Sequence, residues 1–430
     1  MDQGTRETFG SSWGTILSTA GVAIGLGNIW RFPYMMGRFG GSTFLILYLL
    51  VVFSLGVPAL MCEWALGRET RRGPMGAFSR AGLPGGRWWG YLLLLTIVMA
   101  SSYYVVILGW VLYYARIFAF SANTLPSQAL FEGLIQSLPT QFLYVLACII
   151  MGCVSLGFGV KKGIERVSTL VTPLFFLLFA FLILRTLTLE GAMEALVAFL
   201  RPDWGQLSAR SLLAAMGQGL FSLSVGGTFM LIYGSYLRPQ ENIPRGALWT
   251  ASLDVSAALA ASLIIVPGVL VFGIDMASGP PLMFVVLPEV FRHLPWGNLF
   301  GTLFFVSVFL VAMLSLLGAY EVLVGGFQDA WGWSRNRSLA LILLVETLII
   351  LPPMLSVDYI FTSDLIWGST MQPFGAALSV IALAWCIGRG RTLEQLKRHS
   401  RLPVSPFLFY WIKYVVPIAI LLGLIYGWIG

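Results

Sequence analysis

The chain has 430 residues, of which 58% are hydrophobic and only 10% are charged. A soluble domain carries about 25% charged residues, so this composition excludes a soluble multidomain protein, a disordered chain and a nucleic-acid binder. The net charge of +7 is read as the excess of lysine and arginine in the cytoplasmic loops of a membrane protein. We therefore predict an all-α integral membrane protein in contact with the lipid bilayer.

Apolar runs long enough to cross a membrane recur along the whole sequence. A spanning helix needs about 20 mainly apolar residues. The runs are continuous rather than alternating, which favours helices over the strands of a barrel. Eleven transmembrane helices are predicted, near residues 12–36, 42–67, 88–120, 139–158, 164–187, 211–237, 247–273, 297–327, 338–355, 361–388 and 406–428.

Positive charges indicate the orientation. With a cytoplasmic N-terminus, most of the 26 lysines and arginines fall in cytoplasmic loops, while the external loops hold chiefly Arg38, Arg201, Arg210 and Arg292. The positive-inside rule then places the N-terminus in the cytoplasm and the C-terminus outside.

Glycines interrupt the first and the sixth predicted helices, in the segments AGVAIGLGN (20–28) and SLSVGGT (222–228). A break inside the membrane frees backbone groups, which are tolerated only where they line a site. The placement predicts two inverted five-helix repeats, residues 1–190 and 191–388, with a substrate site between them at mid-membrane. Residues 389–430 would form a cytoplasmic loop and the eleventh helix. Close helix packing through small residues is the alternative explanation of the glycines.

Several motifs, in order along nearly the whole chain, resemble the neurotransmitter:sodium symporter family. They are GLGNIWRFPY (25–34), EWALGR (63–68), the tyrosine pair 103–104, KGIER (162–166) and GQGLFSLS (217–224). The resemblance implies a sodium-driven symporter that takes up an amino acid or a related amine by alternating access. It also implies a multi-pass protein of the inner (cytoplasmic) membrane of a prokaryote. The sequence has no catalytic motif, so we predict no enzyme.

The resemblance implies a substrate site at the two helix breaks. The free N–H groups of Leu26 and Gly27, with the Tyr104 hydroxyl, would bind a carboxylate at the positive end of a half-helix. Freed carbonyls and the Ser224 hydroxyl would hold the amine. An ordinary core tyrosine is the alternative for Tyr104. The full predicted set is Ala23, Gly25, Leu26, Gly27, Ala100, Tyr104, Phe221, Ser222, Ser224, Gly227, Ser315 and Ala319.

Small residues in this set favour a large amino acid. Monoamine-carrying relatives have an aspartate at the position of Gly25, so this substrate should bring its own carboxylate. Gly227, Ala319 and Ala100 stand where a leucine-transporting bacterial relative has larger side chains. Each missing methylene leaves room worth about 0.8 kcal/mol to a ligand that fills it. Neighbours such as Met230 or Tyr320 would cancel this effect if they filled the space.

Sodium is the only cofactor that the resemblance implies. The first sodium site maps onto Ala23, Asn28, Ser222 and Asp254, with the substrate carboxylate completing the shell. A fixed carboxylate at Asp254 should make chloride unnecessary, and sodium would supply its countercharge. A protonated structural acid is the alternative for Asp254.

The second sodium site maps onto Gly21, Ile24, Val311 and Ser315. Here Leu314 replaces an oxygen-bearing family residue, and leucine cannot ligate sodium. Weak binding, compensation by a neighbour and a one-ion coupling ratio all remain open.

Two charge pairs match the family's gates. Arg31 and Asp364 would form the outer gate, and Arg6 and Asp329, with Tyr236 nearby, the inner gate. Solvated surface charge is the alternative.

Two other functions remain as alternatives: a proton-coupled amino-acid carrier, suggested by Leu314 and Asp254, and a ligand sensor on the same scaffold. Apart from a small amino acid and the lipid bilayer we predict no nucleic-acid partner and no obligatory protein partner.

Overall fold

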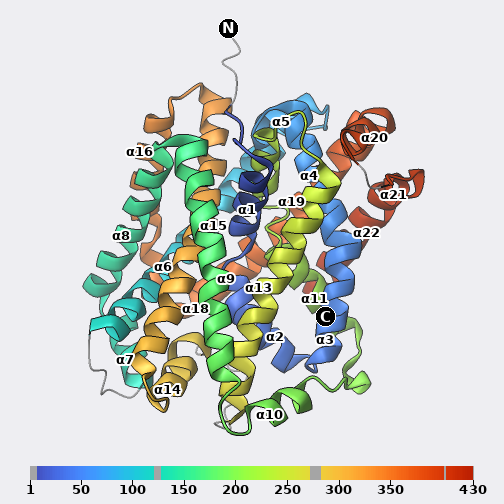
Figure 1. Cartoon of the computed structure of the whole chain (residues 1–430). Coiled ribbons are helices and arrows are strands. Elements are labelled where there is room, and N and C mark those ends of the chain that lie inside the picture. Colours follow the sequence, from blue (N-terminus) through green and yellow to red (C-terminus); the bar gives the residue numbers. More distant parts are fainter. Residues whose placement is uncertain (1–6, 121–126, 272–281, 401–402, 430) are drawn as a thin grey trace.

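The structure is a computed structural model that describes residues 7–120, 127–271, 282–400 and 403–429. Over those ranges the secondary structure is helical, without a strand. Figure 1 shows the long helices side by side in one bundle, with α1 (Ser12–Ala23) at its centre. There α1 packs against α9 (Arg166–Thr186), α13 (Ile243–Val271) and α15 (Gly297–Trp331).

Nine helices in the described part of the chain are long and apolar enough to cross a membrane. They correspond to nine of the predicted runs, all except the first and the sixth. They are Ser42–Thr70 (with α3 and α4), Gly86–Phe120 (α6), Leu138–Gly157 (α8), Val160–Thr186 (with α9), Ile243–Val271 (α13), Gly297–Trp331 (α15), Arg335–Leu355 (with α16), Val357–Ile387 (with α18 and α19) and Pro406–Trp428 (with α21 and α22).

The first and the sixth predicted runs each fold as two half-helices. In the first run, α1 stops at Ala23, and the chain becomes helical again in a π-helical turn, Gly27–Arg31, and α2 (Phe32–Arg38). In the sixth, α11 (Ala209–Ser222) and α12 (Phe229–Ser235) are separated by six non-helical residues, 223–228. The predicted breaks are therefore present in both runs.

Short helices connect the spans at the two ends of the bundle. They are α5 (Pro74–Arg80), α7 (Ser127–Gln136), α10 (Ala192–Phe199), α14 (Leu287–Arg292) and α20 (Arg389–Lys397). In Figure 1, α5 and α20 lie at the end of the bundle from which the N-terminus projects, and α7, α10 and α14 lie at the opposite end.

Prolines account for several wide turns inside the helices. The π-helical segments Gly27–Arg31, Val52–Gly56, Leu282–Val286, Asp364–Met371 and Trp411–Val415 each end two residues before a proline. Proline lacks an N–H and its ring clashes with the carbonyl four residues earlier, so the preceding turn widens. The spanning helices are thus irregular at positions where the sequence contains a proline.

The break in the sixth run is held by its contacts with α4 (Val57–Thr70). Ser224, Gly226 and Thr228 have positive φ angles of 52°, 95° and 59°. The Gly226 N–H donates to a carboxyl oxygen of Glu63 in α4 at 2.7 Å. Further along, a Cβ on Gly234 would lie 2.7 Å from the Trp64 Cα, so α12 and α4 pack backbone against backbone. This half-helix is thus joined closely to α4.

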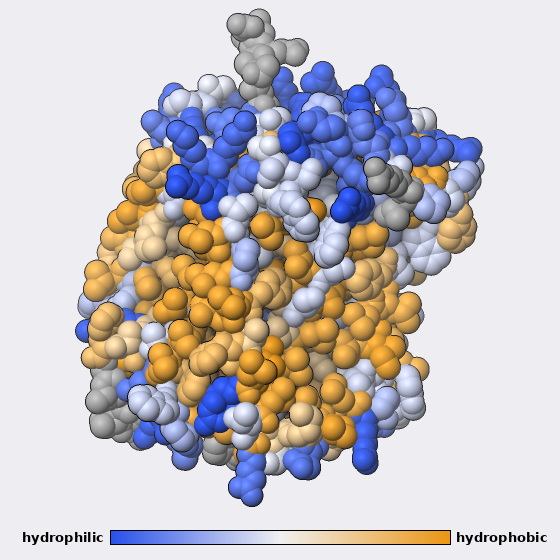
Figure 2. All heavy atoms as spheres, in the orientation of Figure 1, coloured by the Kyte–Doolittle hydropathy of each residue, from blue (hydrophilic) through white to orange (hydrophobic). Residues whose placement is uncertain are grey.

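The surface has the polarity of a membrane protein. Figure 2 shows a broad hydrophobic belt across this face of the molecule and hydrophilic residues at both ends. On α9, Leu170, Leu177 and Leu184 recur at intervals of seven residues and are all exposed, which is a stripe that faces lipid. The chain is therefore a multi-pass membrane protein.

Candidate substrate and sodium site

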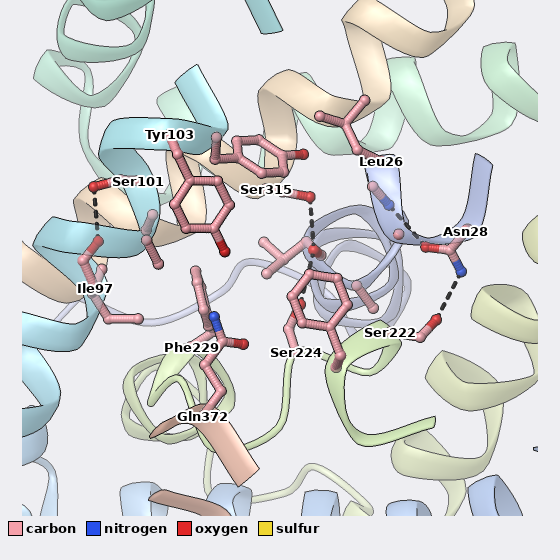
Figure 3. Close-up of a pocket in the computed structure, with 18 residues that line it drawn as sticks. Leu26, Asn28, Ile97, Ser101, Tyr103, Ser222, Ser224, Phe229, Ser315 and Gln372 are labelled. Carbon is pink, nitrogen blue, oxygen red and sulfur yellow. Dashed lines mark hydrogen bonds between the residues drawn. The ribbon is translucent and has the colours of Figure 1, made fainter. Parts of the chain in front are cut away.

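A cavity lies where the two broken helices meet. It is lined by residues of α1 and the first break, of α11, the second break and α12, and of α6, α15 and α19 (Gln372–Ile381). In Figure 3, Ile97, Ser101 and Tyr103 of α6 lie on one side of the cavity, across from Leu26, Asn28 and Ser222. Of the predicted substrate residues, those that line it are Ala23, Gly25, Leu26, Gly27, Ala100, Tyr104, Phe221, Ser222, Ser224, Ser315 and Ala319.

Six further residues border the cavity that the sequence had not singled out for any site: Val22, Ile97, Ser101, Tyr103, Phe229 and Gln372. Tyr103 and Ser101 share the helix of Tyr104, and the tyrosine pair was already part of a recognised motif. Val22, Ile97 and Phe229 carry no distinctive signal in the sequence, because an apolar residue inside a spanning helix is common. Gln372 is a buried polar residue in an apolar span, which is a signal that could have found it.

Tyr104 and the first break form a polar part of the cavity wall. The Tyr104 hydroxyl donates to the Ala312 carbonyl at 3.1 Å. A Cβ on Gly25 would lie 3.1 Å from that hydroxyl and 2.8 Å from the Ser315 hydroxyl oxygen. Glycine at position 25 is therefore required for this close approach, and a side chain there would need the neighbours to move.

The last carbonyls of α1 accept hydrogen bonds from hydroxyl groups. A helix end leaves its final carbonyls without partners in the helix. Here Ser315 donates to the Val22 carbonyl at 2.9 Å and to the Ile24 carbonyl at 3.3 Å. Ser224 donates to the same Val22 carbonyl at 3.2 Å. This region offers several oxygen atoms to a cationic group.

Four apolar side chains also line the cavity, those of Ile97, Ala100, Phe229 and Ala319. Figure 3 shows Ile97 and Phe229 on the side of Ser101, Tyr103 and Gln372. Gly227 lies outside the lining. A Cβ built on it would collide with the Phe229 ring and lie 3.2 Å from the Ile97 side chain. The space beside Gly227 is thus taken by Phe229, rather than by Met230 or Tyr320, which do not line the cavity.

Three residues predicted for the first sodium site form a buried cluster. The Asn28 amide nitrogen donates to the Ser222 hydroxyl at 2.9 Å and to an Asp254 carboxyl oxygen at 2.7 Å. Ser222 donates to the other Asp254 oxygen at 2.7 Å, and Tyr48 donates to that same oxygen at 3.3 Å. The Asn28 side-chain oxygen accepts from the Gly25 N–H at 3.0 Å, and Ala23 lies beside Asn28 in the cavity lining.

The second predicted sodium site is crowded by Leu314. A Cβ on Gly21 would lie 2.6 Å from a Leu314 methyl group, and 3.0 Å from the Thr172 hydroxyl. The Ser315 hydroxyl is directed to carbonyls of Val22 and Ile24. Val311 is buried on α15, one turn before Ser315. A hydrocarbon side chain therefore occupies the position at which family members offer an oxygen.

The outer-gate residues have other partners in this structure. Ion pairs within 4.0 Å in the described ranges do not include Arg31 with Asp364. The Arg31 guanidinium lies 4.7 Å from the centre of the Phe221 ring and donates to Ser369 at 3.0 Å. Asp364 accepts from the Tyr103 hydroxyl at 3.0 Å.

At the other end of the bundle, Arg6 lies outside the described residues. Asp329 accepts a hydrogen bond from the Gly73 N–H and pairs with Arg72 at 3.4 Å. Tyr236 donates to Glu321 at 2.5 Å, and Glu321 pairs with Arg335. The Glu321–Arg335 pair was missed by the sequence analysis, although Glu321 is a charged residue in an apolar run.

Comparison with known proteins assigns the family. The family model described as "Sodium:neurotransmitter symporter family" matches residues 6–133 and 132–429. The chain belongs to this family. The family is one of transporters, so the chain is a membrane transporter and not an enzyme.

The transporter resembles bacterial and animal proteins over most of its length. It is 32% identical to an uncharacterized sodium-dependent transporter, YhdH, of Bacillus subtilis, covering 98% of both chains. It is 27% identical to the sodium-dependent dopamine transporter of Bos taurus, covering 96% of this chain and 67% of that protein. The crystal structure of MhsT in complex with L-phenylalanine aligns with a TM-score of 0.89 at 31% identity, covering 98% of this chain and 99% of MhsT.

Proposed function

We propose that this transporter is a symporter that takes up a large hydrophobic or aromatic amino acid together with sodium, by alternating access and without chloride. The observation that carries the proposal is the cavity at the two helix breaks, which combines Tyr104 and the backbone of the first break with the apolar side chains of Ile97, Ala100, Phe229 and Ala319. A free amino acid needs both its charged groups compensated inside the membrane, and its side chain needs apolar surroundings.

Its relatives support the same function. The solved complex of MhsT contains L-phenylalanine, and the Bacillus relative is named a sodium-dependent transporter. Gly25 supports an amino acid rather than a monoamine, because glycine offers no carboxylate to the amine of a substrate that lacks its own. The substrate carboxylate would take the place beside Leu26, Gly27 and Tyr104.

Sodium would bind at the cluster of Asn28, Ser222 and Asp254, with the Ala23 carbonyl and the substrate carboxylate as further ligands. Hard oxygen ligands suit an alkali cation, and Asp254 supplies a charge to balance it. In this structure the hydroxyls of Tyr48 and Ser222 already donate to Asp254. A fixed carboxylate that these hydroxyls already hold would take the place of an added anion beside the sodium ion, which supports transport without chloride.

The membrane arrangement is proposed as eleven spans in two inverted five-helix repeats, in the cytoplasmic membrane of a prokaryote. The N-terminus would be cytoplasmic and the C-terminus external. This arrangement would place the end of the bundle that carries α5 and α20 in the cytoplasm, together with Arg72, Arg80 and Arg391.

Uptake into proteoliposomes tests the proposal. We expect phenylalanine, tyrosine or tryptophan to accumulate when sodium is high outside, and accumulation to persist when gluconate replaces chloride. Accumulation driven by a pH gradient in the absence of sodium would instead support a proton-coupled carrier. Binding without accumulation under either gradient would support a ligand sensor.

A further inference from the structure

Glu346 is a carboxyl group buried in a membrane-spanning helix outside the substrate and sodium sites. It lies in α16 (Arg335–Ile349), three residues before the end of that helix, and is 1% exposed. A carboxylate inside the membrane is costly unless it is paired, and such residues are often functional. Neither the substrate cavity nor the proposed sodium sites include it.

The partners of Glu346 do not compensate a negative charge. The Ser101 hydroxyl donates to one carboxyl oxygen at 2.5 Å. The other oxygen is buried and has no hydrogen-bond partner within the described ranges, and no ion pair there includes Glu346. Because one neutral donor leaves a buried carboxylate largely uncompensated, the geometry favours the neutral acid.

The titratable groups that face Glu346 come from two neighbouring helices. Cys153 of α8 and Tyr320 of α15 lie close enough to interact with it electrostatically. Neither carries a positive charge. The Tyr320 hydroxyl is itself buried without a partner in the described structure. On the helix of Glu346, Arg335 is paired with Glu321 instead.

A single hydrogen bond connects Glu346 to a residue of the cavity wall. Ser101, which donates to it, lines that cavity together with Ile97, Ala100 and Tyr104 of the same helix. Figure 3 shows Ser101 at the α6 side of the cavity. Glu346 also borders a second, very small cavity whose other lining residues are Val98, Leu323, Phe327, Leu341, Ile342 and Val345.

We propose that Glu346 is a proton-binding site that Ser101 couples to amino-acid binding. The step is the addition of one proton to the Glu346 carboxylate, which forms an O–H bond and breaks no bond of the protein. A bound amino acid that fills the cavity excludes water from Ser101 and so disfavours the charged form of Glu346. The complex therefore binds more protons than the free protein.

The sign of the pH effect follows from linkage. If binding takes up one proton at Glu346, the affinity for the amino acid rises as pH falls. The rise is up to about tenfold per pH unit, between the pKa of Glu346 in the free protein and its pKa in the complex. Glu346→Gln mimics the neutral acid and should bind with the wild-type affinity seen at low pH, without this dependence. Asp254 and Glu63 remain in that variant, so their own contributions to the pH profile are unchanged.

Infrared difference spectroscopy with amino-acid binding over a pH series tests the inference, which rests on the proposed function. We expect a protonated-carboxyl band in the free protein that is lost as pH rises, and phenylalanine binding should move this loss to higher pH. Glu346→Gln should abolish the band, Ser101→Ala should move it, and Glu194→Gln, an exposed control, should leave it unchanged.

Two outcomes would overturn the proton site: a band that persists in Glu346→Gln, or an unchanged pH dependence of binding in that variant. If the wild-type protein binds no amino acid, the proposed function fails. In that case the band of the free protein still decides whether Glu346 carries a proton. Thermal unfolding of Glu346→Gln against wild type shows whether the variant is folded.

Discussion

The Ser222 hydroxyl donates to the Asp254 carboxyl at 2.7 Å. This hydrogen bond joins the end of α11, at the second helix break, to a charged residue of α13. Because both residues are fully enclosed, a cation placed beside them would be dehydrated and strongly held by the carboxylate.

Asp254→Asn tests this charge. We expect sodium affinity to fall by about ten- to a hundredfold, because a ligand of a buried cation loses its formal charge while its shape is kept. Binding of amino acid measured against sodium concentration, with chloride and with gluconate, checks this. Asp358→Asn, on an exposed carboxyl, is the control. Unchanged sodium dependence would remove Asp254 from the ion site.

Tyr104→Phe tests the carboxylate position. A hydroxyl that binds a charged group contributes about 1.5–3 kcal/mol, so amino-acid affinity should fall by about ten- to a hundredfold. The variant also loses the hydrogen bond to the Ala312 carbonyl, so thermal unfolding has to be measured beside binding. Tyr426→Phe, on an exposed tyrosine, is the matched control. A folded variant with wild-type affinity would place the carboxylate elsewhere.

Gly25→Ala tests the close approach at the first break. The new methyl group would lie 2.8 Å from the Ser315 hydroxyl oxygen but 3.7 Å from the Ser315 Cβ. We expect Gly25→Ala to weaken binding strongly, and the double variant Gly25→Ala with Ser315→Ala to recover part of the loss relative to Ser315→Ala alone. Titration calorimetry on the four proteins gives the coupling energy. Strictly additive losses would contradict a contact between the two residues.

Gly227→Phe tests the size of the cavity. Because the Phe229 ring already lies against Gly227, a second ring there would push Phe229 into the cavity. Tryptophan should then be excluded while leucine still binds. Combining Gly227→Phe with Phe229→Ala should restore space for tryptophan. Competition of tryptophan and of leucine against a labelled substrate measures both affinities in each variant. Retained tryptophan binding in Gly227→Phe would contradict the predicted loss of space.

Leu314→Thr tests the number of sodium ions. The leucine methyl group packs at Gly21, and threonine would replace it with a hydroxyl near the carbonyls of the first break. We expect the wild-type protein to couple one sodium ion to each amino acid and the variant to couple two. Reversal of the flux at known gradients in proteoliposomes gives the ratio. A ratio of two in the wild type would mean that a neighbouring group already compensates for Leu314.

The spans and the two breaks were predictable from the sequence for simple physical reasons. Continuous apolar runs of sufficient length have no other stable place than the bilayer, and glycine clusters mark where a helix is weakest. The breaks observed after Ala23 and after Ser222 are in the predicted segments. The repeat symmetry and the assignment of individual ligands stay predictions.

The details of the cavity depend on tertiary packing, which a single sequence does not show. Phe229 lines the cavity at the start of α12, directly after Thr228, which adopts a positive φ of 59°. The contact of Arg31 with Phe221 likewise depends on how the π-helical turn Gly27–Arg31 meets α11. By contrast, Glu321 and Glu346 were visible as charged residues within apolar runs and were overlooked.

The joint between α4 and α12 has a mechanical consequence. Glu63 is hydrogen-bonded to the Gly226 amide, and there is no space between the backbones at Gly234. We therefore expect α4 and α12 to move together as one rigid unit. Bending in any gate motion would then fall to residues 223–225, between α11 and Gly226, and to the first break, residues 24–26. The close packing of α4 against α12 thus determines which segments of the two broken helices can bend.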